Sequence, residues 1–128
     1  MKRLVLLAAT ALAMQAQAAC PPAAEAGAPM VAGAVHLAWR ADPQTIVVGQ
    51  PFAVLVSVCP ATVQLTRVDA TMPEHRHGMN YRPTIRALGD GLWRAEGLLW
   101  HMRGRWELRL DVQGPGGLQT LRQSVVLP

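Results

Sequence analysis

The segment RWELRLDVQ, residues 105–113, carries the clearest secondary-structure pattern of the chain. Trp106, Leu108, Leu110 and Val112 alternate in it with charged or amide residues. Successive side chains of a β-strand point to opposite faces, so a period of two places the apolar residues on one face and the charged residues on the other. The pattern predicts an antiparallel strand with one buried and one solvated face.

Similar rows recur along the chain, and residues 52–58 form one that is rich in β-branched side chains. Turn signals such as Gly89-Asp90-Gly91 separate the rows, and no helical period of 3.6 residues persists. Further strands are expected at residues 35–39, 63–72, 81–88, 92–100 and 118–127. About seven short strands predict an immunoglobulin-like, antiparallel β-sandwich over residues 34–128, with a small barrel as the alternative.

The N-terminus has the features of an export signal. Lys2 and Arg3 precede an uncharged apolar run, and Ala16-Gln17-Ala18 provides a small-x-small cleavage pattern. The run is about eleven residues long, whereas a membrane-spanning helix needs about 20. We therefore expect a signal peptide at residues 1–19, a flexible segment at 20–33, a periplasmic or secreted protein, and no stable membrane span after cleavage. Lipidation of Cys20 is the less favoured alternative, because Gln17 stands where lipoproteins usually have leucine.

The chain has two cysteines, Cys20 and Cys59. Two cysteines of a small exported domain most often pair. A disulfide between them would close a loop of about 40 residues and stabilise the fold by about 4 kcal/mol on the chain-entropy model. A metal site made by the two thiolates is the less favoured alternative.

The charge of the chain does not indicate a nucleic-acid partner. The formal net charge is +4, and removal of Lys2 and Arg3 with the signal peptide leaves +2. The remaining basic residues are arginines that interleave with acidic residues rather than forming a block. No nucleophile elbow, phosphate loop or HExxH motif is present, so we expect no enzymatic activity.

Histidine and methionine are concentrated in two short segments. The first, MPEHRHGMN at residues 72–80, lies between expected strands, and the second is His101-Met102. Thioether sulfur binds hard cations poorly but suits Cu(I), and imidazole suits copper in either oxidation state. These segments predict a copper site, and the candidate ligands are Met72, His75, His77, Met79, His101 and Met102. The alternative is an ordinary loop whose histidines bond backbone carbonyls, with Met72 and Met102 closing the end of the sandwich.

Three motifs resemble those of the YtkA-like and FixH-like domains of bacterial envelopes. They are Met72-Pro73-x-His75-x-His77-Gly78-Met79, Gly91-x-Trp93-x-Ala95 and Leu99-x-x-Met102-x-Gly104-x-Trp106-x-Leu108. The resemblance covers about residues 50–127; Trp93 stands where many relatives have tyrosine, and Arg76 where glycine is common between the histidines. It implies an immunoglobulin-like sandwich, copper handling, and a partner in the envelope or in the assembly of respiratory oxidases. Some relatives carry an auxin-binding label.

The leading hypothesis is therefore an exported copper-binding or copper-carrier protein without turnover chemistry. His101 is not part of the resemblance and enters only through its position beside Met102. Two other hypotheses stay open. The chain could be a non-metal accessory module that docks on an envelope complex through an arginine-rich surface (Arg82, Arg86, Arg94), or a protein that binds a small molecule.

Overall fold

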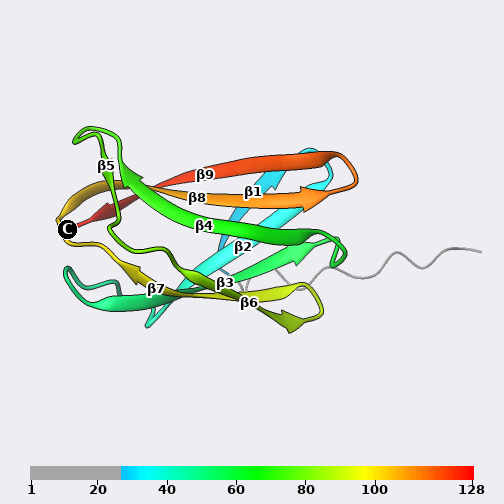
Figure 1. Cartoon of the computed structure of the whole chain (residues 1–128), viewed down its shortest axis with the longest axis horizontal. Helices are drawn as coiled ribbons and strands as arrows, with labels where there is room; N and C mark the ends of the chain where they lie inside the picture. Colours follow the sequence, from blue (N-terminus) through cyan, green and yellow to red (C-terminus); the bar gives the residue numbers. More distant parts are fainter. Residues whose placement is uncertain (1–26) are drawn as a thin grey trace, which may run out of the picture.

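The computed structural model describes residues 27–128, which form two antiparallel sheets packed face to face (Figure 1). The strands are β1 (Ala28–Ala32), β2 (Val35–Asp42), β3 (Pro51–Cys59), β4 (Gln64–Met72), β5 (His77–Gly78), β6 (Thr84–Gly89), β7 (Leu92–Leu99), β8 (Gly104–Gly114) and β9 (Gly117–Leu127). Residues 27–128 contain no helix, and hence none of the length and apolarity that crossing a bilayer requires.

The strand order identifies the type of sandwich. One sheet has the order β1-β2-β3-β7-β6 and the other β5-β4-β8-β9. The chain crosses between the sheets after β3, returns before β6, and crosses again after β7. With β1 and the two-residue β5 set aside, this is the arrangement of immunoglobulin-like domains: the fifth remaining strand, β7, pairs with the second, β3, and the sixth, β8, pairs with the third, β4. The predicted β-sandwich is confirmed.

Two strands were not expected from the sequence. β1 lies within residues 20–33, which we expected to be flexible, and pairs with β2 along its whole length, burying Met30. β5 is a two-residue strand that pairs only with Thr71 and Met72. Both are too short for a period of two to be visible. In addition, β6 begins only at Thr84, because the preceding Pro83 has no backbone N–H for a sheet hydrogen bond.

The core between the sheets comes from the alternating residues of the two central strands. Val54, Val56 and Val58 of β3 are fully buried, as are Leu108 and Leu110 of β8. Burial of such a side chain contributes about 1.5–3 kcal/mol. The apolar face predicted for residues 105–113 is therefore the face that packs against the other sheet.

Aromatic rings close the core at one end of the sandwich. Trp100 and Trp106 stack in parallel with their centroids 5.2 Å apart, and Phe52 meets Trp100 edge-on at 5.2 Å. Both indoles are fully buried. This end is where β7 finishes and β8 begins, and the packed rings give the connections above them a rigid base.

The predicted signal peptide and Cys20 lie outside the described residues. Cys59 is the last residue of β3 and is buried. The Cys20–Cys59 pairing stays a prediction.

Candidate metal-binding site

A tight hairpin between β4 and β5 carries two of the predicted ligands. The backbone N–H of His75 donates to the carbonyl of Met72 at 3.1 Å, and that of Arg76 to the carbonyl of Pro73 at 3.3 Å. Arg76 takes the left-handed conformation, with φ of 56°, and this reverses the chain. As a result His75 and His77 lie side by side, with ring centroids 5.7 Å apart.

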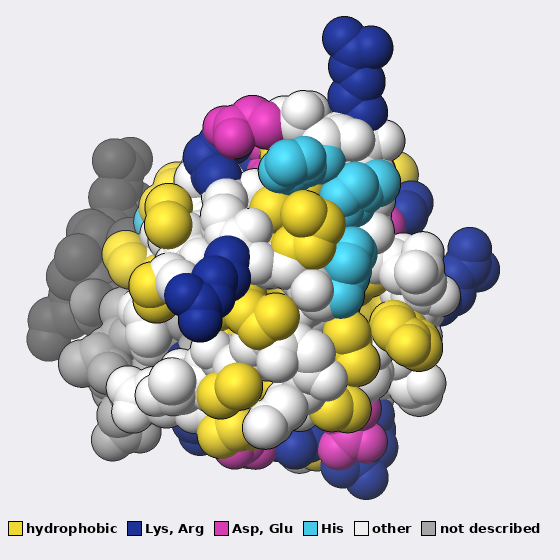
Figure 2. All heavy atoms as spheres, turned by 90° about the vertical axis from the view of Figure 1, so that its left-hand side faces the viewer, with side chains coloured by type: hydrophobic (Ala, Val, Ile, Leu, Met, Phe, Trp, Pro, Cys, Tyr) yellow, Lys and Arg dark blue, Asp and Glu magenta, His cyan; other side chains and the backbone are white. Residues whose placement is uncertain are grey.

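A third histidine reaches the same place from the other connection. His101 follows β7, and its ring centroid lies 5.1 Å from that of His77. Histidine side chains gather beside hydrophobic side chains on this end of the molecule (Figure 2). We call His75, His77 and His101 the imidazole cluster. His77 is its centre and is half-buried, whereas His75 and His101 are exposed.

Trp106 forms the base of the imidazole cluster. Its ring centroid lies 6.2 Å from that of His77 and 5.6 Å from that of His101, and both contacts are edge-to-face. The indole Nε1–H donates to the backbone carbonyl of Met102 at 3.0 Å, which fixes the ring and holds the β7–β8 connection over it. A buried, hydrogen-bonded ring limits how far the two imidazoles can move apart.

The predicted methionine ligands occupy three different positions. Met72 is the direct cross-strand partner of His77, so their side chains leave the sheet on the same face, and Met72 is buried against Gly104. Met102 is half-buried in the β7–β8 connection. Met79 lies two residues beyond His77, and its backbone N–H donates to Ala70 at 3.2 Å. Met79 also lines a groove beside β4.

One atom of the imidazole cluster lacks a partner. Among residues 27–128, the buried side-chain nitrogens without a hydrogen bond are His77 Nδ1 and Trp100 Nε1, both at this end of the sandwich. An unsatisfied buried nitrogen costs about 1–3 kcal/mol unless another group binds it. The lone pair of an imidazole nitrogen can bind a metal ion.

The described residues contain no group of three His, Cys, Asp or Glu side chains arranged to hold a metal ion. A site made of imidazoles alone is therefore not preformed. The geometry brings together two imidazoles from the separate connections, and Met72 is the register partner of one of them. The carboxylate of the hairpin, Glu74, is already bound to Arg105 at 3.0 Å, an ion pair that ties the hairpin to β8.

The three histidines meet at this end of the sandwich, Met72 pairs with the central one, Met102 lies in the β7–β8 connection, and Met79 lies two residues beyond His77. The sequence pattern did not indicate that the Trp106 ring contacts both His77 and His101. The spacing of Trp106 four residues after Met102 is the only signal for that role, and it is equally typical of a core residue. His36 lies on β2 and makes no ring contact with the imidazole cluster.

The sequence matches no known protein-family model, and comparisons with curated proteins and with solved structures find no significant match.

Proposed function

We propose that this protein binds a copper ion at the imidazole cluster and carries it without chemical turnover. The observation that supports this best is the meeting of His77 and His101 from separate connections, with centroids 5.1 Å apart, next to an unpartnered buried Nδ1 of His77. A metal ion bound by both His77 and His101 would hold the two connections together, as bound metal ions do in small domains.

His77 and His101 are the proposed central ligands, and Met72 is the proposed thioether. Met72 is the nearest methionine by sheet register, because it pairs directly with His77. His75 and Met102 flank this set at the surface. The exposed His75 and His101 suit a carrier, since a partner could approach the ion from the surface and replace donors one at a time.

The donor types favour Cu(I) over the other common ions. Calcium and magnesium require several oxygen ligands, and Glu74 is engaged by Arg105. Structural zinc sites usually have four cysteine or histidine ligands, and no such group occurs among residues 27–128. Two imidazoles and a thioether match the softer cation.

Titration of the mature chain with Cu(I), in competition with a chromophoric chelator, tests the proposal. His77→Ala should weaken binding by about 100-fold, because it removes the central donor. His36→Ala is the matched control, since it deletes an exposed imidazole on β2 and should leave the affinity unchanged. Equal affinities of the two variants would refute the site.

The indole base offers a second readout. Trp106 contacts both proposed imidazole ligands, so a bound copper ion should quench part of the tryptophan fluorescence. Silver ions, which are also soft and monovalent, should compete with Cu(I) in this assay. Quenching that is the same in His77→Ala would mean that the ion binds elsewhere.

The proposed setting is the periplasm, reached through the predicted signal peptide at residues 1–19. A partner of the bacterial envelope would then supply or receive the copper ion. Amino-terminal sequencing of the exported protein should give a start at residue 19 or 20.

A further inference from the structure

β6 is the outermost strand of its sheet and pairs only with β7 (Figure 1). Alternate residues of an edge strand direct their backbone N–H and C=O groups away from the sheet. Within residues 27–128, no hydrogen bond outside the β6–β7 ladder involves residues 84–89. The outer edge of β6 is therefore open to pairing with another extended chain.

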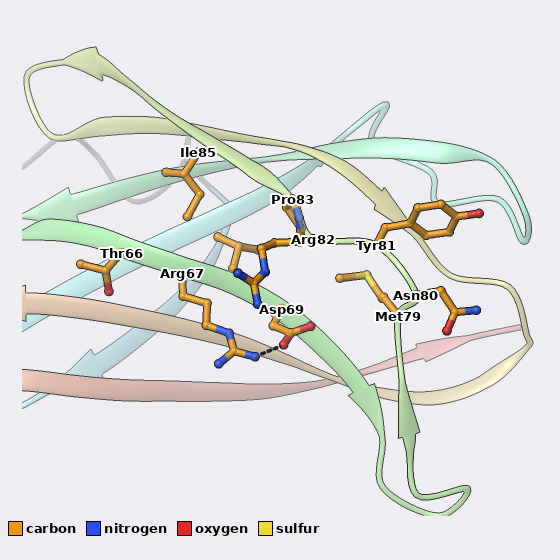
Figure 3. A pocket seen from close by; sticks show the side chains of 10 residues that line it. Thr66, Arg67, Asp69, Met79, Asn80, Tyr81, Arg82, Pro83 and Ile85 are labelled. Atoms are coloured by element: carbon orange, nitrogen blue, oxygen red, sulfur yellow. Dashed lines mark hydrogen bonds and ion pairs between the residues drawn. The ribbon is translucent and has the colours of Figure 1, made fainter.

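The other sheet does not close over β6. The groove between β4 and the segment 79–85 separates them, and the side chain of Ile85 points into it (Figure 3). Ala87 lies on the same face of β6 as Ile85, because side chains two residues apart on a strand share a face. Its cross-strand partner Trp93 packs against the core, whereas Ala87 itself is exposed. The inner face of β6 is thus an apolar strip that borders an open space.

The outer face of β6 carries an arginine that has no carboxylate partner. Arg86 is exposed and lies directly opposite Arg94 of β7. Arg94 binds Asp42 and Glu96, both at 2.7 Å, whereas Arg86 has no ion pair or side-chain hydrogen bond within residues 27–128. On the β7 side, the cross-strand neighbour of Arg86 is thus a like charge. A carboxylate partner fits at the position opposite Arg86 on the open side of β6.

We propose that β6 binds an extended acidic segment of a partner protein, which adds to the sheet as an antiparallel strand. The backbone of this segment pairs with the open edge of β6. A carboxylate on its outer face lies opposite Arg86, and apolar side chains on its inner face lie beside Ile85 and Ala87. A second copy of β6 does not fit this description, since its sequence TIRALG contains no carboxylate.

The other sheet edges are less suited to strand addition. β1 contains Pro29, which has no backbone N–H, and a groove lined by both strands lies between β1 and β9 of the other sheet. The pairing of β4 with β8 is irregular between Leu65 and Arg67, and such a bulge twists an edge away from a new strand. By contrast, the pairing of β6 is regular from Thr84 to Ala87.

Three synthetic peptides test the proposal on the metal-free, ¹⁵N-labelled mature chain. The acidic peptide alternates valine with glutamate, and the basic peptide has lysine in place of glutamate. The third keeps glutamate but has proline in place of valine, which removes backbone N–H groups that a strand requires. The acidic peptide should shift the amide resonances of residues 84–89 and slow the hydrogen exchange of alternate amides there. The other two peptides should bind at least about fivefold more weakly.

Two variants locate the added strand. Arg86→Gln should weaken binding of the acidic peptide by about threefold, because it removes an exposed ion pair. Arg40→Gln is the matched control and should leave the affinity unchanged. Arg40 is exposed on the same face and in the same cross-strand row as Arg86, but it lies on β2, away from this edge.

Four results would each overturn the proposal: no shift with the acidic peptide, equal binding of the three peptides, no slowed exchange in residues 84–89, or equal effects of the two variants. The first result would mean that Arg86 only protects the edge against pairing, as charged residues on edge strands often do. Because copper is absent, these results are independent of the imidazole cluster.

Discussion

Polar side chains gather both on the outer face of the β4-β8-β9 sheet and at the end of the sandwich that carries the imidazole cluster. The two regions differ in how far these side chains find hydrogen-bond or ion-pair partners. On the outer face, charged residues from three strands pair with one another, and we call them the charged network: Arg67, Asp69, Glu107, Arg109, Asp111 and Arg122. In the imidazole cluster, three rings lie together and the central one has an unpartnered buried nitrogen.

Asp111 shows how complete the pairing of the charged network is. Its two oxygens accept hydrogen bonds from Arg109 Nε and Nη2, both at 2.9 Å, and one accepts a further bond from the Thr120 hydroxyl at 2.7 Å. Burial raises the pKa of this carboxyl, but the hydrogen bonds from Arg109 and Thr120 outweigh it and leave the pKa below its ordinary value. Such a group stabilises the fold, and both of its oxygens are already engaged by protein donors.

We infer that pairing, rather than polarity, distinguishes the structural groups of this molecule from the groups proposed to bind a ligand. The charged network should therefore affect stability and leave copper binding unchanged, and the imidazole cluster should do the reverse.

The largest effect is expected at His101, which sequence resemblance did not include. His101→Ala should weaken Cu(I) binding by about 100-fold, because it removes the donor that comes from the second connection. The side chain is exposed, so the free energy of unfolding should change by less than about 0.5 kcal/mol. Chelator competition and urea unfolding measure the two quantities. An unchanged affinity would confine the site to the β4–β5 hairpin and break the proposed geometry.

Asp111→Asn is the opposite substitution. It should lower the free energy of unfolding by about 2 kcal/mol, because hydrogen bonds to a charged acceptor are replaced by weaker ones and Arg109 loses its partner. Cu(I) affinity should equal that of the unmodified chain. A loss of copper binding in the still-folded variant would mean that the charged network and the imidazole cluster are coupled.

Acid should weaken the charged network in a defined pH range. The pKa of Asp111 is lower in the folded chain than in the unfolded chain, so its contribution is present above the unfolded value of about 3.9 and is lost as the pH falls through the folded value. The stability difference between the unmodified chain and Asp111→Asn should therefore shrink between pH 6 and pH 2.5. Urea unfolding at both pH values measures it, and a constant difference would contradict the assigned role.

Much of the fold could be predicted from sequence because strands of the core carry a strong period of two. Residues 105–113 fall within β8, and 52–58 within β3, since buried and exposed faces alternate over many residues. β1 and β5 could not be found, because their position depends on pairing with β2 and β4 rather than on their own composition. The crossing from β3 to β4 likewise depends on packing of whole sheets.

The sequence predicted which residue types and segments form the candidate site, but not which of their side chains meet. Clustered histidine and methionine identified the two connections, since three of the four histidines and three of the six methionines lie in them. Which side chains meet depends on the left-handed turn at Arg76 and on the register that pairs Met72 with His77. Met79 follows this register with a hydrogen bond from its backbone N–H to the carbonyl of Ala70.

The smallest effect is expected at the exposed margin of the charged network, where Glu107 accepts from Arg122 Nε at 3.2 Å. Both side chains are partly exposed, so water and salt screen the pair, and Glu107→Gln should cost only about 0.3 kcal/mol. Urea unfolding at low and at high salt measures this cost, which should disappear at high salt. A loss of unfolding free energy as large as that of Asp111→Asn would show that the charged network acts as one unit. Pairing at Asp111 alone would then no longer explain how the charged network stabilises the fold.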